Sequence, residues 1–125
     1  MGAIDTFFFD TYAFFEILKG NPNYQKYKNE VSMVTTKLNL MELHYGLLLS
    51  IGKEEADLRF DEYSYYTTEI TDSVLKKATE FKAFHRKRNI SYIDSIGYTI
   101  AKLVGIKFLT GDQQFKDLEN VEFVK

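Results

Sequence analysis

Residues 7–12, FFFDTY, decide the fold that the sequence predicts. Three consecutive aromatic residues bounded by polar ones are typical of a strand that is buried on both faces of a parallel sheet. Asp10 follows them directly, so it should stand at the carboxyl end of this strand, where open α/β sheets have their ligand crevice. A buried carboxylate there is unfavourable without a partner. Either a structural salt bridge or a ligand must therefore account for Asp10.

Outward from this stretch, the pattern alternates between strands and helices. Further strands are predicted at residues 31–35, 106–110 and 121–124, with a brief one at 66–70. Helices are predicted at residues 12–19, 23–30, 39–51, 53–66, 72–88, 91–104 and 113–118. We therefore expect an α/β fold with a mostly parallel central sheet of four to five strands and helices on both faces.

One helix carries a basic cluster. The segment 72–88 places Phe84 on its predicted inner side and ends with Arg86, Lys87 and Arg88. These cations have two interpretations: contact with an RNA backbone, or solvation together with a favourable interaction with the helix dipole. The second is favoured, because charge runs are usually solvated faces.

Length and composition bound the protein class. A chain of 125 residues, of which 45% are hydrophobic, suits one domain over residues 1–125. With 11 Phe and 9 Tyr, much of the packing must come from large rings that can also form an interface, so a homo-oligomer is expected. The absence of Cys excludes disulfides, thiolate catalysis and Cys-based zinc sites.

Net charge and hydropathy limit the ligands and the cellular surroundings that the sequence predicts. A net charge of −2 provides no global basic field, so a polyanionic ligand would need a basic patch or a bound cation. No apolar stretch approaches the 18 or so residues of a membrane span, and the N-terminus lacks the pattern of a signal peptide. We expect a soluble, cytoplasmic protein with no membrane partner.

Four acidic residues stand at predicted element boundaries: Asp10, Glu42, Asp94 and Asp112. In a doubly wound sheet such boundaries share one rim, so the four carboxylates are expected to converge. Convergent carboxylates repel one another unless a cation lies among them, and hard oxygen ligands favour Mg²⁺ or Mn²⁺. Such ions activate water and stabilise charge on a phosphodiester during hydrolysis.

A structural explanation competes for three of the four. Asn39 with Glu42, and Ser91 with Asp94, match the spacing of a capping box, and Asp112 suits the N-cap of the helix that follows. Taken singly, each of these acids is more simply explained by capping. Only Asp10 lacks that explanation.

Three segments carry a resemblance to a known family: FFFDTYAFFE (7–16), NLMELHYGLL (39–48) and SYIDSIGYTIAKLVGIKFLTGDQQF (91–115). In this order, and followed by a short strand, they resemble the PIN-domain ribonucleases, especially the small VapC toxins. The acids of that family fall on Asp10, Glu42, Asp94 and Asp112. Thr110 and Phe115 match the flanks of the last motif.

The resemblance implies the fold of a PIN-like domain, and it also implies a function. It implies an endoribonuclease that uses Mg²⁺ or Mn²⁺ to hydrolyse RNA phosphodiester bonds, is inhibited by a small antitoxin and forms a homodimer. Asp10, Glu42, Asp94 and Asp112 would be metal ligands and catalytic residues, and the sequence does not distinguish which of them orients the water. The alternative is a catalytically silent module that binds a partner protein or RNA.

Uncharged residues beside the acids have open roles. Thr11 and Thr110 would contact a metal-bound water or a phosphate, or else satisfy local backbone groups, which is the commoner role of such a Thr. Tyr12, Tyr45 and Tyr98 would stack bases near the acidic rim, although aromatic residues at helical spacing more often belong to the core.

Overall fold

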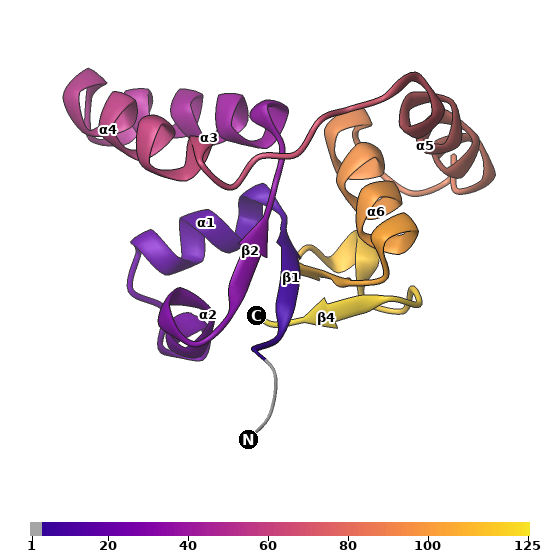
Figure 1. The fold of residues 1–125 in the computed structure, drawn as a ribbon, viewed down its shortest axis with the longest axis horizontal. Coiled ribbons are helices and arrows are strands. Elements are labelled where there is room, and N and C mark those ends of the chain that lie inside the picture. Colours follow the sequence, from indigo (N-terminus) through magenta and orange to yellow (C-terminus); the bar gives the residue numbers. More distant parts are fainter. Residues whose placement is uncertain (1–3) are drawn as a thin grey trace.

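A four-stranded, entirely parallel sheet forms the centre of the computed structural model, which describes residues 4–125 (Figure 1). Residues 1–3 of the predicted domain lie outside the described part. The strands β1 (Thr6–Phe9), β2 (Ser32–Val34), β3 (Lys107–Thr110) and β4 (Val121–Phe123) lie in the order β2-β1-β3-β4. The predicted α/β class with a parallel sheet is confirmed.

Strand β1 is central because both of its neighbours pair with it. Phe8 lies in register with Val34 on one side and with Phe108 on the other. Its ring stacks on that of Phe108 at 5.8 Å, and both rings are fully buried. Successive side chains of a strand point to opposite faces. Phe7 and Phe9 accordingly belong to one core cluster and Phe8 to the other.

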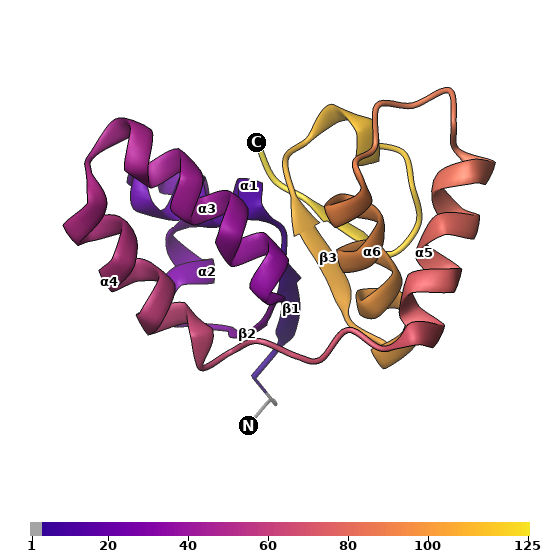
Figure 2. The same ribbon diagram turned by 90° about the horizontal axis from the view of Figure 1, so that it is seen from above.

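Helices cover both faces of the sheet, as predicted (Figure 2). The cluster around Phe7 and Phe9 contains residues of α1 (Thr11–Leu18), α2 (Gln25–Asn29), α3 (Lys37–Ser50) and α4 (Lys53–Ser64). The cluster around Phe8 contains residues of α5 (Asp72–Phe84) and α6 (Tyr92–Val104). Two 3₁₀ turns, η1 (Pro22–Tyr24) and η2 (Gln113–Phe115), complete the chain. No helix within residues 4–125 has both the length and the apolar character to cross a membrane.

A glycine lets α6 approach the sheet closely. A Cβ atom on Gly97 would lie 2.6 Å from the Phe8 ring, which is closer than van der Waals contact allows. A larger residue at this position would therefore push α6 away from β1. Because α6 carries Asp94 in its first turn, this contact also sets how near that carboxylate comes to the end of β1.

Several predicted elements differ from the structure, among them the helix at 113–118, of which only the 3₁₀ turn Gln113–Phe115 forms. Residues 66–70 form only a single bridge between Thr67 and Thr35, so the brief fifth strand is absent. The helix predicted at 39–51 begins at Lys37, because the Thr36 side chain accepts a hydrogen bond from the backbone of Asn39 and acts as its N-cap. The capping residue was thus placed three positions too late.

Helix α5 is also shorter than the 72–88 predicted. It ends at Phe84, whose side chain is 82% exposed rather than internal. The chain then turns, and the Arg88 guanidinium pairs with Asp117 at 2.8 Å and donates to the carbonyl of Gln114. Continuation of the helix would carry Arg88 away from these partners. Arg88 is therefore engaged in tertiary contacts, contrary to the prediction of a solvated helix end.

Candidate active site

The four predicted acidic residues line a single cavity of about 410 Å³ at the carboxyl edge of the sheet. Asp10 follows β1, Glu42 lies on α3, Asp94 lies on α6 and Asp112 follows β3. No residue that lines this cavity is basic. The expected convergence is therefore observed. The complete lining is Asp10, Thr11, Tyr12, Phe15, Glu42, Tyr45, Gly46, Asp94 and Asp112.

Asp10 is the most buried of the four acids, at 2% exposed. Its Oδ1 accepts the backbone N–H of Thr11 at 2.8 Å, and its Oδ2 accepts the hydroxyl of Thr110 at 2.6 Å. Burial raises the pKa of Asp10 well above its usual value, and the Asp94 and Glu42 carboxylates raise it further, against the two hydrogen bonds.

Within residues 4–125, no cationic side chain forms a salt bridge with Asp10. Every salt bridge found among residues 4–125 is formed by other acids. The salt-bridge explanation that the sequence left open is therefore wrong for the described part of the chain. Of the two explanations, the ligand remains.

Glu42 is not part of a capping box, because Thr36 rather than Asn39 caps α3. Its Oε1 instead accepts the hydroxyl of Thr11 at 2.6 Å. This contact joins the start of α1 to the second turn of α3. The Glu42 carboxylate is thus oriented by a tertiary hydrogen bond, whereas a capping role would have turned it toward its own helix.

Asn39 supports that contact and was missed as a site residue. Its side chain is fully buried, donates to Thr11 Oγ1 at 3.1 Å and accepts the hydroxyl of Thr36 at 2.6 Å. A hydroxyl has one proton, so a Thr11 oxygen that accepts from Asn39 directs its own proton to Glu42. In the sequence, the available signal was the polar Asn39 between the apolar residues Leu38 and Leu40. The interpretation of Asn39 as a helix cap concealed this signal.

Asp94 caps its helix, as predicted, and also lines the cavity. It forms a capping box with Ser91, in which Asp94 N–H donates to Ser91 Oγ at 3.1 Å and Ser91 N–H donates to Asp94 Oδ2 at 3.4 Å. Burial raises the pKa of Asp94, as does the charge of Glu42. Capping and a place in the acidic cavity are compatible here.

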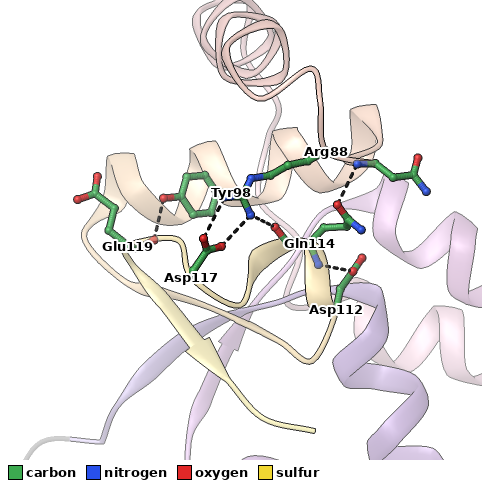
Figure 3. Close-up of polar contacts among 7 residues, drawn as sticks. Arg88, Tyr98, Asp112, Gln114, Asp117 and Glu119 are labelled. Atoms are coloured by element: carbon green, nitrogen blue, oxygen red, sulfur yellow. Dashed lines mark hydrogen bonds and ion pairs between the residues drawn. The ribbon is translucent and has the colours of Figure 1, made fainter.

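Asp112 is the predicted N-cap, and its Oδ1 accepts the backbone N–H of Gln114 at 2.9 Å. Figure 3 shows how the following segment is held: Arg88 donates to the carbonyl of Gln114 at 2.9 Å, and the Tyr98 hydroxyl donates to that of Glu119 at 2.7 Å. These contacts anchor the loop that carries Asp112 to the α5–α6 side of the sheet.

Thr110 links two of the acids. Its hydroxyl donates to Asp10 Oδ2 and accepts the backbone N–H of Asp112 at 3.1 Å. Both of the Thr residues singled out in the sequence are therefore hydrogen-bonded within the protein. Each of them orients a carboxylate of the cavity.

The donor set suits a hard divalent cation. All four charged groups are carboxylates, and the repulsion that raises the pKa of Asp10 is what a bound cation would relieve. Within residues 4–125, no three Asp, Glu or His side chains lie close enough together to enclose a metal ion by themselves. Mg²⁺ does not require such a cage, because it keeps several water ligands and is commonly held by one or two carboxylates. The residues therefore fit an ion that is partly hydrated.

Comparisons with known proteins agree with this architecture. The sequence profile described as PIN domain matches residues 7–121. The search of curated proteins found no match. Several solved structures share the fold at low sequence identity.

Three of these structures illustrate the likeness. VapC20 of Mycobacterium tuberculosis, a toxin that cleaves the sarcin-ricin loop, superposes with a TM-score of 0.80 at 18% identity, covering 95% of this chain and 99% of that one. A toxin–antitoxin complex from Klebsiella pneumoniae gives 0.74 at 13% identity, covering 93% and 95%. DNA-bound VapBC from Salmonella typhimurium gives 0.71 at 15% identity, covering 98% of each chain.

Proposed function

The chain belongs to the PIN-domain family, and on that basis we propose that it is an endoribonuclease dependent on Mg²⁺ or Mn²⁺ and the toxin of a toxin–antitoxin pair. One observation carries the proposal most directly. Asp10 is buried beside Asp94 and Glu42 in a shared cavity, without a basic partner in the described part of the chain. Such an arrangement is unfavourable for ionised carboxylates, and a bound cation would relieve it.

Asp10, Glu42, Asp94 and Asp112 line the cavity that would hold the ion, one or two of them as direct ligands and the others through water. A bound divalent cation supplies positive charge to a phosphodiester and makes hydroxide available near neutral pH. Oxygen-rich sites of this type select Mg²⁺ or Mn²⁺ over softer metals.

The contribution of the chain itself is orientation. Thr110 holds Asp10 at 2.6 Å, and Thr11 holds Glu42 at the same distance. These hydrogen bonds favour the ionised carboxylates, which are the forms that ligate a cation. Ser91 fixes the first turn of α6, and with it the position of Asp94. The carboxylates are thus largely preorganised for an ion and a phosphate.

A nuclease assay tests the proposal. RNAs of varied sequence and structure are incubated with the purified protein in Mg²⁺, in Mn²⁺ and in chelator, with Asp94→Asn as the matched variant. We expect internal cleavage by the wild type only with metal, and a loss of at least about 100-fold in the variant, comparable with removal of one key electrostatic group in an enzyme. If neither protein cleaves any RNA, the chain is instead a silent binding module.

We also propose an antitoxin partner, a homodimer and a cytoplasmic location. Solved structures that share the fold include toxin–antitoxin complexes. Exposed apolar side chains on α3 and α4 offer surface for a protein partner, among them Leu49 at 72% exposed and Leu58 at 54%. Light scattering of the isolated protein tests the dimer. Co-purification with the product of an adjacent gene tests the antitoxin.

A further inference from the structure

We propose that the ring of Tyr45 is a stacking platform for an unpaired RNA base next to the scissile phosphate. This inference rests on the proposed nuclease function and assigns one of its substrate-binding residues. It follows from the part of the cavity lining that is aromatic rather than acidic.

Tyr45 stands beside the acids yet remains accessible. It lies three residues after Glu42 on α3, which places the two side chains on one helix face, and both line the cavity. The side chain of Tyr45 is 65% exposed. By contrast, Tyr98 is 3% exposed and stacks on Phe81 at 4.5 Å, so it belongs to the core. The structure thus separates two tyrosines that the sequence left equivalent.

Two further rings extend the aromatic side of the cavity, and each of them packs closely against a glycine. A Cβ on Gly46 would lie 2.4 Å from the Phe15 ring, and a Cβ on Gly111 would lie 2.4 Å from that of Tyr12. Both rings line the cavity together with Tyr45. Since the two rings pack directly on backbone, they form a fixed wall.

Of these rings, Tyr45 is the one available to a base. Tyr12 carries the Lys125 ammonium over its ring, with Nζ 5.7 Å from the centroid, and Phe15 packs on α3. The same contact brings one positive charge to Tyr12, at the rim of an otherwise acidic cavity, where an RNA backbone requires it.

The chemistry of RNA favours this assignment. A phosphate bound among the carboxylates places the adjoining nucleotide at the edge of the cavity, which is where Tyr45 lies. Bases that are unstacked from a helix bind to proteins by stacking on aromatic side chains, largely irrespective of their identity. A base within a duplex has no free face to offer. The aromatic side of the cavity therefore selects unpaired RNA.

Fluorescent RNA tests the inference independently of cleavage. A short single-stranded RNA of mixed sequence carries 2-aminopurine at its adenine positions and is bound in Ca²⁺, with the matched duplex for comparison; cleavage is measured separately in Mn²⁺. Tyr45→Leu removes the ring and Tyr45→Phe retains it. Tyr65→Leu is the control, because Tyr65 is 86% exposed but does not line the cavity.

We expect the wild type to quench 2-aminopurine and to bind the single strand more tightly than the duplex. Tyr45→Leu should lose the quenching and weaken binding roughly 5- to 150-fold, which corresponds to one stacked base. Tyr45→Phe and Tyr65→Leu should resemble the wild type. In cleavage, the loss in Tyr45→Leu should appear mainly in KM.

The outcomes separate the two proposals. Normal cleavage, affinity and quenching in Tyr45→Leu would overturn the stacking inference and leave the nuclease function intact. If that variant also lost self-association, Tyr45 would be a contact between protein chains instead, and the stacking inference would still be overturned. Quenching that depends on Tyr45 in a protein that cleaves no RNA would support the platform and refute the nuclease. Equal binding of duplex and single strand would refute selection for unpaired RNA.

Discussion

Carboxylates in the cavity and on the outer surface of this protein have opposite electrostatic surroundings. Burial raises the pKa of Asp10 and of Asp94, and neighbouring acids raise both further. On the surface, hydrogen bonding to Arg88 lowers the pKa of Asp117, and hydrogen bonding to Lys102 lowers that of Glu119. The same chemical group is thus destabilised as an anion in one region and stabilised in the other.

The difference shows where the fold retains unfavourable energy. A surface carboxylate has water and a cation, and its ion pair changes stability little. Asp10 in the cavity is buried and forms no salt bridge within residues 4–125, so its charge is expected to be compensated by a ligand. Strained groups of this kind concentrate at functional sites. The contrast therefore supports the cavity, rather than the ion-paired surface, as the site of function.

The largest effect expected is the response to metal. Asp10→Asn removes one charge with almost no change in shape, so without metal the variant should melt several degrees higher than the wild type. Mn²⁺ at about 100 times its Kd should stabilise the wild type by about 2.7 kcal/mol and the variant less. Thermal melts with and without Mn²⁺ measure both effects. A variant that melts lower, in a protein that does not respond to Mn²⁺, would make Asp10 purely structural.

Next in size is the effect of the hydroxyl that orients Glu42. Thr11→Val removes the hydroxyl and Thr11→Ser keeps it. Loss of a group that orients a metal ligand typically reduces metal affinity by about 10- to 100-fold. We expect this loss in Thr11→Val and near-normal affinity in Thr11→Ser, measured by calorimetric titration with Mn²⁺. Equal affinities in the two variants would limit Thr11 to satisfying the buried amide of Asn39.

The pH dependence of stability should distinguish the two regions. The pKa of Asp10 is higher in the folded than in the unfolded protein, so its contribution is full below the unfolded pKa and is lost as pH rises through the folded one. Each unit of difference corresponds to about 1.4 kcal/mol. Metal-free wild type should thus lose stability as pH rises above about 4, the usual pKa of an unfolded Asp, and Asp10→Asn should lose less.

Asp117→Asn is the matched control for this slope. The pKa of Asp117 is lowered on folding, so its contribution is present above the unfolded pKa and is lost as pH falls through the folded value. Replacing it should leave the slope above about pH 5 unchanged, because the unfolded pKa of an Asp is about 4 and the folded pKa of Asp117 is lower still. Chemical denaturation at a series of pH values measures the slopes. Similar changes in both variants would contradict the contrast between the regions.

The smallest effect is expected at an exposed ion pair. Lys102→Gln removes the partner of Glu119, whose side chain is 74% exposed. Solvent screens such pairs, so the melting temperature should change by about one degree or less, and cleavage should not change. A large loss of stability would show that the surface pairs, and not only the cavity, set the stability of this protein.

Much of the fold followed from local pattern. The aromatic run at residues 7–9 predicted a strand buried on both faces, and Phe8 and Phe9 are fully buried. The Ser91–Asp94 spacing predicted a capping box that the structure contains. Helix ends were harder to predict from the sequence. Helix α5 ends at Phe84, because Arg88, four residues later, contacts Asp117 and Gln114.

The sequence by itself determined the alternation of strands and helices, the acids at their boundaries and the resemblance that joins them. Those properties depend on neighbours along the chain, where periodicity and capping act. Only the tertiary structure decided that Asp10 has no salt-bridge partner among the described residues, that Thr11 and Asn39 orient Glu42, and that Tyr45 is open while Tyr98 is buried. These properties depend on residues that are distant in sequence and are brought together by packing on the sheet, so no local pattern encodes them.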